Sequence, residues 1–371
     1  MLFLKESILK VVVIGQKLKS QKSLITKENQ QQHDFQKFQM TYGKLVFLLC
    51  IFAVFGKKLK SSKSLLSNKN KLQHDFQKFK KTYGKSYDSQ EQESYIFNVF
   101  LENLKEADKL NRENPSAKFG ITQFSDQTKE EFLNLYANAN LPRDIDIIDS
   151  FIQNTSGTDS QVESYASLPT SWDIRVDGPG KLQPVKNQGF CGSCWAFAIT
   201  STVENLYSIK QNLNLNLSEQ QQVDCVYNRD GCTGGWADAY DYVKKTGLAI
   251  SSRYPYTGYS GSCRAQQVGQ LYKISSYKNL PNDSNAIKQA LVNNGALAVV
   301  VDASNWGSYQ GGILSNQPLQ INKFATIIGY GSNYWLLRNT WGTNWGEQGH
   351  IRVANNGTGG IALSYAYQPY L

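Results

Sequence analysis

Residues 184–198 read PVKNQGFCGSCWAFA, a glycine-bounded loop with two cysteines that runs into an apolar, helix-favouring segment. Cys194, the second of these cysteines, falls where the helix would begin. A helix N-terminus stabilises negative charge, so a thiol at this position is shifted toward the nucleophilic thiolate. Cys194 is therefore a candidate nucleophile. Gln188 lies six residues upstream, and its side-chain amide is a candidate oxyanion donor together with the backbone N–H of Cys194.

The two cysteines of this stretch allow a second interpretation, in which Cys191 and Cys194 form a CxxC metal or redox pair. The whole string, and CGSCW in particular, instead resembles the active-site segment of papain-like cysteine peptidases of the cathepsin L type. The resemblance implies that Cys194 is the nucleophile, Gln188 the oxyanion donor and Cys191 a disulfide partner. It implies neither a metal nor a cofactor.

The chain has six cysteines, and Cys50 lies in an apolar run that is expected to be removed. The remaining cysteines are odd in number, so one of them stays unpaired or pairs with another chain. The residues alone allow several pairings. The family resemblance leaves Cys194 free and implies the disulfides Cys191–Cys232 and Cys225–Cys263.

The net charge of +9 is concentrated near the N-terminus. Residues 1–85 carry 18 Lys and Arg against 4 Asp and Glu, residues 86–167 carry 6 against 15, and residues 168–371 carry 15 against 11. The part with the cysteine motif is only mildly basic, which argues against nucleic acid as a partner. The family resemblance implies polypeptide substrates or ligands, the chain's own propeptide and protein inhibitors as partners.

The N-terminal region contains a repeat, because residues 15–44 recur at 56–85 with a constant offset of 41. The apolar run 45–56 is short for a transmembrane helix but typical of a signal peptide, and Met40 offers an alternative start just before it. Residues 1–56 are therefore expected to be a signal or hydrophobic region without a stable membrane span. With the disulfide-type cysteines, this predicts the secretory route, to a lysosome, a vacuole or the cell exterior.

Residues 75–111 have apolar side chains at helical spacing, and Thr128 with Glu131 predicts a second helix start with a capping box. The region 57–135 resembles the inhibitory propeptide of the same family. The polar stretch 136–167 is expected to be a linker and the processing region. The residues that match the two propeptide motifs are Phe100, Asn103, Asn111, Gly120, Phe124 and Asp126.

The peptidase-like part is expected to span residues 168–371. Its first half favours helices, and short β-rich runs separated by Gly and Asn follow after position 270, which indicates an α+β fold with an antiparallel sheet. The resemblance implies a papain-like two-domain fold. In this fold a helical half and an antiparallel β-barrel half enclose the active-site cleft, and an α-helical pro-domain precedes them.

Two glycines and their neighbours are candidates for peptide binding. Gly234 and Gly235 permit close backbone approach, in a tight turn or, as the resemblance implies, against an extended peptide. The resemblance places Trp236 and Ala237 at the rim of the pocket for the second side chain before the cut. Phe324 replaces a small residue that lines this pocket, which predicts a smaller pocket.

The position of the family's general-base histidine is occupied by Lys323, in the segment INKFATIIGYG. Asn339 matches the residue that orients the histidine, and Trp341 matches the indole that shields them. His350 is expected to be a packed structural residue of a strand. A lysine ammonium stabilises a thiolate, but while charged it is a poor acid for the leaving amine and no base for water.

Two functions follow from this substitution. In the first, the protein is a cysteine endopeptidase made as a secreted zymogen and slowed by Lys323, since loss of acid–base catalysis costs ~10²–10⁴-fold in rate. The alternative is an inactive pseudo-peptidase that binds peptides, inhibitors or protein partners. Turnover of an extended peptide by the processed protein distinguishes the two.

Overall fold

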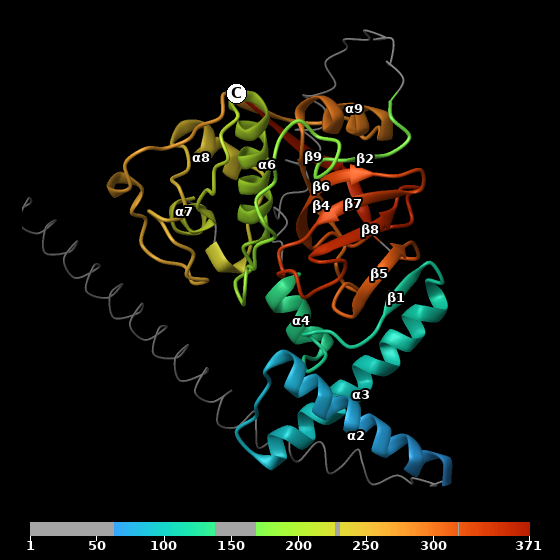
Figure 1. Ribbon diagram of the computed structural model, residues 1–371. Helices are drawn as coiled ribbons and strands as arrows, with labels where there is room; N and C mark the ends of the chain where they lie inside the picture. Colours follow the sequence, from blue (N-terminus) through green and yellow to red (C-terminus); the bar gives the residue numbers. More distant parts are fainter. Residues whose placement is uncertain (1–62, 138–167, 227–230, 318) are drawn as a thin grey trace, which may run out of the picture. The chain divides into compact units, whose positions relative to one another are not determined.

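The computed structural model describes residues 63–137, 168–226, 231–317 and 319–371 (Figure 1). The chain divides into two compact units, Met1–Asn70 and Lys71–Leu371. The predicted signal region and most of the predicted linker lie outside the described residues. No helix within the described ranges is long and apolar enough to cross a membrane.

Two long helices form the first part of the pro-region, α2 (Lys63–Tyr83) and α3 (Gln90–Glu113). Their shared core consists of the fully buried rings of Phe76, Phe79 and Phe100. The prediction of one helical run over 75–111 is wrong, because Gly84 has a φ of +62° and breaks the chain between the helices. The Ser89 side chain then accepts a hydrogen bond from the Gln92 N–H and starts α3.

A short strand and a third helix complete the pro-region, β1 (Ala117–Phe119) and α4 (Lys129–Tyr136). The predicted capping box at the start of α4 is confirmed. The Thr128 hydroxyl accepts from the Glu131 N–H at 3.2 Å, and the Glu131 carboxylate accepts from the Thr128 N–H at 2.8 Å. Side chains of α3 hold the connection between β1 and α4, since the Asn103 amide donates to the carbonyls of Ser125 and Gln127 at 3.0 and 2.7 Å.

The remaining strands join one sheet in the order β1-β5-β8-β7-β6-β4-β9-β3, and β2 pairs with β6. The expected barrel half is corrected here. The sheet of the described residues is open, with β1 and β3 at its edges, and β5 and β8 run parallel. These strands are β2 (Trp172–Asp173), β3 (Ser276–Asn279), β4 (Leu297–Val301), β5 (Tyr309–Leu314), β6 (Lys323–Tyr330), β7 (Tyr334–Arg338), β8 (His350–Ala354) and β9 (Ile361–Tyr370).

Strand β1 extends the sheet with a segment of the pro-region. It pairs antiparallel with β5, with Ala117 opposite Gly312 and Lys118 opposite Gly311. The buried Asn114 side chain adds to this contact, because its oxygen accepts from the backbone N–H of Asn316 at 2.7 Å. Backbone pairing of this kind fixes the register between the pro-region and the peptidase part.

The helical half of the peptidase part is built around α6 (Cys194–Gln211), which runs beside β6 and β4 (Figure 1). Most of its length is buried, and it ends at Asn212, whose backbone is left-handed with a φ of +55°. The helix α7 begins after Ser218, whose hydroxyl accepts from the Gln221 N–H at 3.0 Å. The further helical elements are α7 (Glu219–Cys225), η1 (Gly231–Thr233), α8 (Ala239–Lys245), η2 (Ala265–Gln267) and α9 (Ser284–Asn294).

Candidate active site

Cys194 is the first residue of α6, and only 1% of its surface is exposed. It is the free cysteine of the described residues. The Cys194 Sγ accepts a hydrogen bond from the Phe324 backbone N–H at 3.4 Å. The side chain of Ser193 does not cap the helix and contacts the Tyr256 hydroxyl at 2.7 Å instead. The thiol therefore lies at the N-terminus of α6, next to the positive end of the helix dipole.

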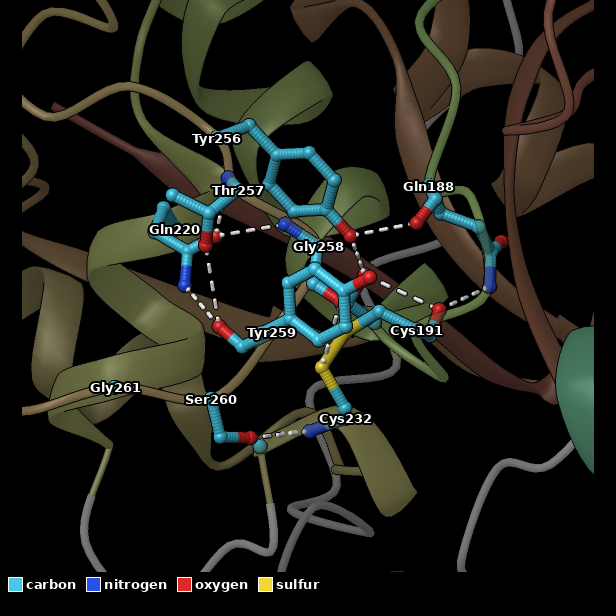
Figure 2. The surroundings of a disulfide bond; sticks show 12 residues. Gln188, Cys191, Gln220, Cys232, Tyr256, Thr257, Gly258, Tyr259, Ser260 and Gly261 are labelled. Atoms are coloured by element: carbon cyan, nitrogen blue, oxygen red, sulfur yellow. Dashed lines mark hydrogen bonds between the residues drawn. A yellow bond between two sulfur atoms is a disulfide. The ribbon is translucent and has the colours of Figure 1, made fainter.

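The loop before Cys194 is fixed by a disulfide and by two hydrogen bonds. The Gln188 side-chain N–H donates to the Cys191 carbonyl at 2.8 Å, and the Tyr256 hydroxyl donates to the Gln188 backbone carbonyl at 2.7 Å (Figure 2). Burial raises the pKa of Tyr256 to about 12, so this phenol stays a donor near neutral pH. The disulfides expected from the family resemblance are present: Cys191–Cys232 and Cys225–Cys263.

Lys323 is the first residue of β6, and its side chain is completely buried. Its ammonium donates to the Gln188 Oε1 and the Thr340 hydroxyl, each at 3.0 Å, and to the Tyr136 carbonyl at 3.4 Å. The Nζ also lies 4.5 Å from the centre of the Trp341 ring, a cation–π contact. All three N–H donors of the ammonium thus have neutral acceptors.

Burial lowers the pKa of Lys323 to about 8, against the opposing effect of a charge on Cys194. No salt bridge within the described part of the chain involves this lysine. The ammonium therefore loses hydration without gaining a carboxylate partner, which is why its neutral form is favoured. The pKa of Lys323 is thus closer to that of a histidine than the pKa of an exposed lysine is.

The side-chain amide of Gln188 is oriented by hydrogen bonds from Lys323 and Thr340. Its Oε1 accepts from the Lys323 ammonium and from the Thr340 hydroxyl, which leaves its nitrogen facing the loop of Cys191. Only one of the two N–H donors of that nitrogen is needed for the Cys191 carbonyl. Lys323 and Thr340 thus fix the orientation of the Gln188 amide.

Asn339 follows β7 and is buried, but it does not pair with Lys323. Its Oδ1 accepts from the Thr340 backbone N–H at 2.8 Å, and its Nδ2 is buried without a partner in the described ranges. The lysine side chain is longer than a histidine and reaches past Asn339 to Gln188 and Thr340. The family resemblance implies that Asn339 orients the residue at the histidine position. Asn339 makes no hydrogen bond to Lys323 and so does not orient it in this way.

Several residues expected to bind peptide, Trp236, Ala237 and Phe324, lie in one buried cluster with Cys194. Gly234 has a φ of +129°, and a Cβ on Gly235 would lie 2.4 Å from the ring of Trp195. Trp236 packs against the Phe324 ring at 5.2 Å, and both side chains are buried. Ala237 is buried beside them with 1% exposure. The Phe324 ring thus lies next to Trp236, and the smaller second-side-chain pocket stays a prediction.

A buried charged cluster, which the sequence analysis missed, supports the motif loop. The Lys186 ammonium contacts the carboxylates of Glu204 on α6 and Glu219 on α7 at 2.8 and 2.6 Å. Burial raises the pKa of Glu204 to about 7, although Lys186 opposes this change. The cluster ties the start of the motif loop to two helices. The signal in the sequence was a charged residue in each of two otherwise uncharged segments, Lys186 in KNQG and Glu219 in LSEQ.

His350 lies on β8 and is buried, as expected for a packed strand residue. Its Nδ1 is 3.2 Å from the Glu347 carbonyl, and burial lowers the pKa of its ring. None of its hydrogen bonds in the described residues involves Cys194 or Lys323. The site gains instead two residues that sequence reasoning missed, Thr340 between Asn339 and Trp341, and Tyr136 from the pro-region.

Trp341 is fully buried, and aromatic side chains of the pro-region surround it. The rings of Phe124, Phe132 and Tyr136 lie at 5.1, 5.4 and 6.0 Å from it, all in edge-on arrangements. The Gln123 amide donates to the Trp341 carbonyl at 3.1 Å. Because Tyr136 also supplies a carbonyl to Lys323, the end of α4 covers the site.

A buried free thiol at a helix start, with a pro-region helix packed on Lys323 and Trp341, is the arrangement of a cysteine peptidase precursor. Residues 168–368 match the papain family cysteine protease pattern, and residues 76–132 match the cathepsin propeptide inhibitor domain. The chain belongs to the papain family of cysteine proteases and has the architecture of a zymogen.

Individual relatives agree with this assignment. Fruit bromelain of Ananas comosus is 34% identical over 75% of this chain and 81% of the relative, and cathepsin L 1 of Paramecium tetraurelia is 33% identical over 76% and 88%. The solved structure of a recombinant stem bromelain precursor has a TM-score of 0.67 at 31% identity and covers 81% of this chain and 99% of its own. Digestive procathepsin L 3 of Tenebrio molitor has a TM-score of 0.66 at 30% identity, with the same shares covered.

Proposed function

We propose that the processed protein is a cysteine endopeptidase in which Cys194 attacks the peptide carbonyl and Lys323 carries the proton. The observation that supports this most directly is the hydrogen bond from Lys323 to Gln188, beside the buried thiol at the start of α6. One side chain thereby supplies a proton donor and orients the oxyanion donor. No group of His, Cys, Asp and Glu residues suited to a metal occurs in the described part.

In the first step, the Cys194 thiolate forms a bond to the carbonyl carbon and the oxygen takes the negative charge. The N–H groups of Cys194 and Gln188 receive this oxyanion. The amine leaves with a proton from the Lys323 ammonium, and an acyl-enzyme and a neutral lysine remain. In the second step, neutral Lys323 accepts a proton from water, the hydroxide attacks the thioester, and the acid product leaves the regenerated thiolate and ammonium.

The rate of this cycle is limited by the lysine. Most of Lys323 is charged at neutral pH and does not activate water, because its pKa is about 8 in the precursor and departure of α4 reduces the burial that lowers it. Replacement of an efficient acid–base group costs ~10²–10⁴-fold in rate, so hydrolysis is expected to be slow. Alkylation of Cys194 requires only the thiolate, so this reaction is expected to be fast in the processed protein.

The proposed localisation rests on the disulfides and on the protein family. The two disulfides and the cathepsin-type relatives support the secretory route, ending in a lysosome, a vacuole or the cell exterior. The substrates are polypeptides, and the pro-region is the inhibitor that is removed. Gly234 and Gly235 supply the backbone edge along which an extended substrate lies.

The test compares processed protein with its Lys323→His variant, alone and with Phe324→Ala to widen the pocket. We expect both forms to be alkylated at Cys194 at similar rates, and the histidine form to hydrolyse an extended peptide at least 10-fold faster, as restored acid–base catalysis predicts. Cys194→Ser is the control for contaminating activity. Equal turnover by both forms would refute the proposal that Lys323 limits the rate of hydrolysis. No turnover by either form would support the alternative of an inactive pseudo-peptidase that binds peptides.

A further inference from the structure

We propose that removal of the pro-region turns Lys323 into a binding site for a carboxylate, namely the C-terminal carboxylate of a peptide. The site is part of the cleft described above, so the inference rests on the proposed papain-type site, although not on its turnover. Its ligand class is the acid product of a cleavage or a peptide with a free C-terminus. The argument starts from the three acceptors of the Lys323 ammonium.

Two of these acceptors belong to the peptidase part and one to the pro-region. Gln188 and Thr340 stay when the pro-region is cut away, whereas the Tyr136 carbonyl leaves with α4. Tyr136 is the last residue of α4, where carbonyl groups lack helical partners and carry partial negative charge. The precursor thus already places the negative end of a helix on this ammonium.

Departure of α4 leaves one N–H of the Lys323 ammonium without its protein acceptor and uncovers the ammonium on that side. A carboxylate in the vacated place satisfies both the donor and the charge. The described residues contain no acidic side chain in a salt bridge with Lys323, so the peptidase part does not neutralise it. The one other anionic group that acts on Lys323 is the thiolate of Cys194, whose charge opposes the fall in the lysine pKa.

The surroundings favour a peptide terminus over a small anion. The pro-region covers Trp341 with three aromatic rings, and their departure uncovers an indole next to the ammonium. An apolar last side chain can pack on this indole while its own carboxylate reaches Lys323. The vacated acceptor is a main-chain oxygen, and a terminal carboxylate presents oxygen from the same position of a chain.

Binding is measured on processed protein carrying Cys194→Ser, which removes both turnover and the competing thiolate. The probes are N-acetylated tetrapeptides of one sequence ending in Phe as the free acid, in Phe as the amide, and in Asp as the amide. A charge-assisted hydrogen bond predicts that the free acid binds about 10-fold to 100-fold more tightly than the Phe amide. Lys323→Met should abolish this ratio, and Lys323→Arg, which keeps the charge, should retain most of it.

Equal binding of acid and amide by the Lys323 protein would overturn the proposal, and so would a ratio that persists in Lys323→Met. Tighter binding of the Asp amide than of the free acid would overturn the assignment to a peptide terminus. Circular dichroism of each variant verifies that it is folded. Because every sample contains Cys194→Ser, failure of the proposed peptidase activity leaves this result unchanged.

Discussion

The contact between α4 and Trp341 makes a quantitative prediction about the precursor. Phe132 lies on α4 with 5% exposure, and its ring contacts Trp341 at 5.4 Å. On the peptidase side it also packs against Gly307, where an added Cβ would lie 3.3 Å from the ring. Within the pro-region it contacts Phe124 and Tyr136 at 5.3 and 5.7 Å. The ring is thus shared between the two parts.

Replacement of a buried Phe by Ala costs ~3–5 kcal/mol in all. About half of the contacts of Phe132 are to the peptidase part, so roughly 2 kcal/mol of this cost is lost from the packing of α4 on the peptidase part. This loss corresponds to an increase of about 30-fold in the fraction of precursor in which α4 has left the site. The assay is the rate of alkylation of Cys194 in the precursor, divided by the rate in processed protein. Phe132→Ala should raise this ratio about 30-fold, up to the limit of the processed protein.

Asn134→Ala is the matched control, because Asn134 lies on the exposed face of the same helix. It should leave the alkylation rate of the precursor unchanged. If Phe132→Ala protects Cys194 as well as the unmodified precursor does, α4 does not hold the site closed. The assignment of α4 as the cover would then be wrong.

Three further perturbations address the charge on Lys323 and the start of α4. The fall in the pKa of Lys323 from 10.5 to about 8 corresponds to about 3 kcal/mol of destabilisation at pH 7. Because the pKa of Lys323 is lower in the folded state than in the unfolded state, the folded protein loses stability as pH falls from 10.5 to 8. Denaturant unfolding should therefore show the largest gain in unfolding free energy from Lys323→Met at pH 7, and most of this gain should be gone by pH 10. A gain that does not change with pH would contradict a lowered pKa. In processed protein, deacylation should rise with pH from 6 to 8, because only the neutral amine of Lys323 activates water and its pKa, about 8 in the precursor, is no lower once α4 has left; a burst experiment showing a flat rate between these values excludes Lys323 as the base. Thr128→Ala removes the α4 cap, at a cost of about 1 kcal/mol, and should raise alkylation of the precursor at Cys194 about 5-fold; Asn134→Ala, an exposed position of the same helix outside its first turn, should not.

The features that follow from local sequence were predictable. Cys194 begins α6 because a glycine-bounded loop precedes an apolar run, and Thr128 with Glu131 caps α4 because both partners lie within one turn. The break at Gly84 was missed because apolar residues at helical spacing continue on both sides of it. A left-handed backbone at one glycine interrupts the helix without changing that pattern.

Contacts made by the backbone were not predictable in the same way. β1 joins β5 through main-chain groups, and Tyr136 reaches Lys323 through a carbonyl, which every residue type has. β5 contains Gly311 and Gly312 and lacks the alternation that identifies a strand.

Exchange of histidine for lysine joins functions that are usually separate. The same ammonium orients Gln188, donates to the end of α4 and is the proposed proton carrier for Cys194. In the precursor all of its donors are engaged, so the pro-region restrains the site by covering the thiol and also by occupying the proton carrier. A variant that only loosens α4, such as Phe132→Ala, should therefore show the roughly 30-fold gain in alkylation, while its peptide hydrolysis rises no further than the rate that Lys323 allows.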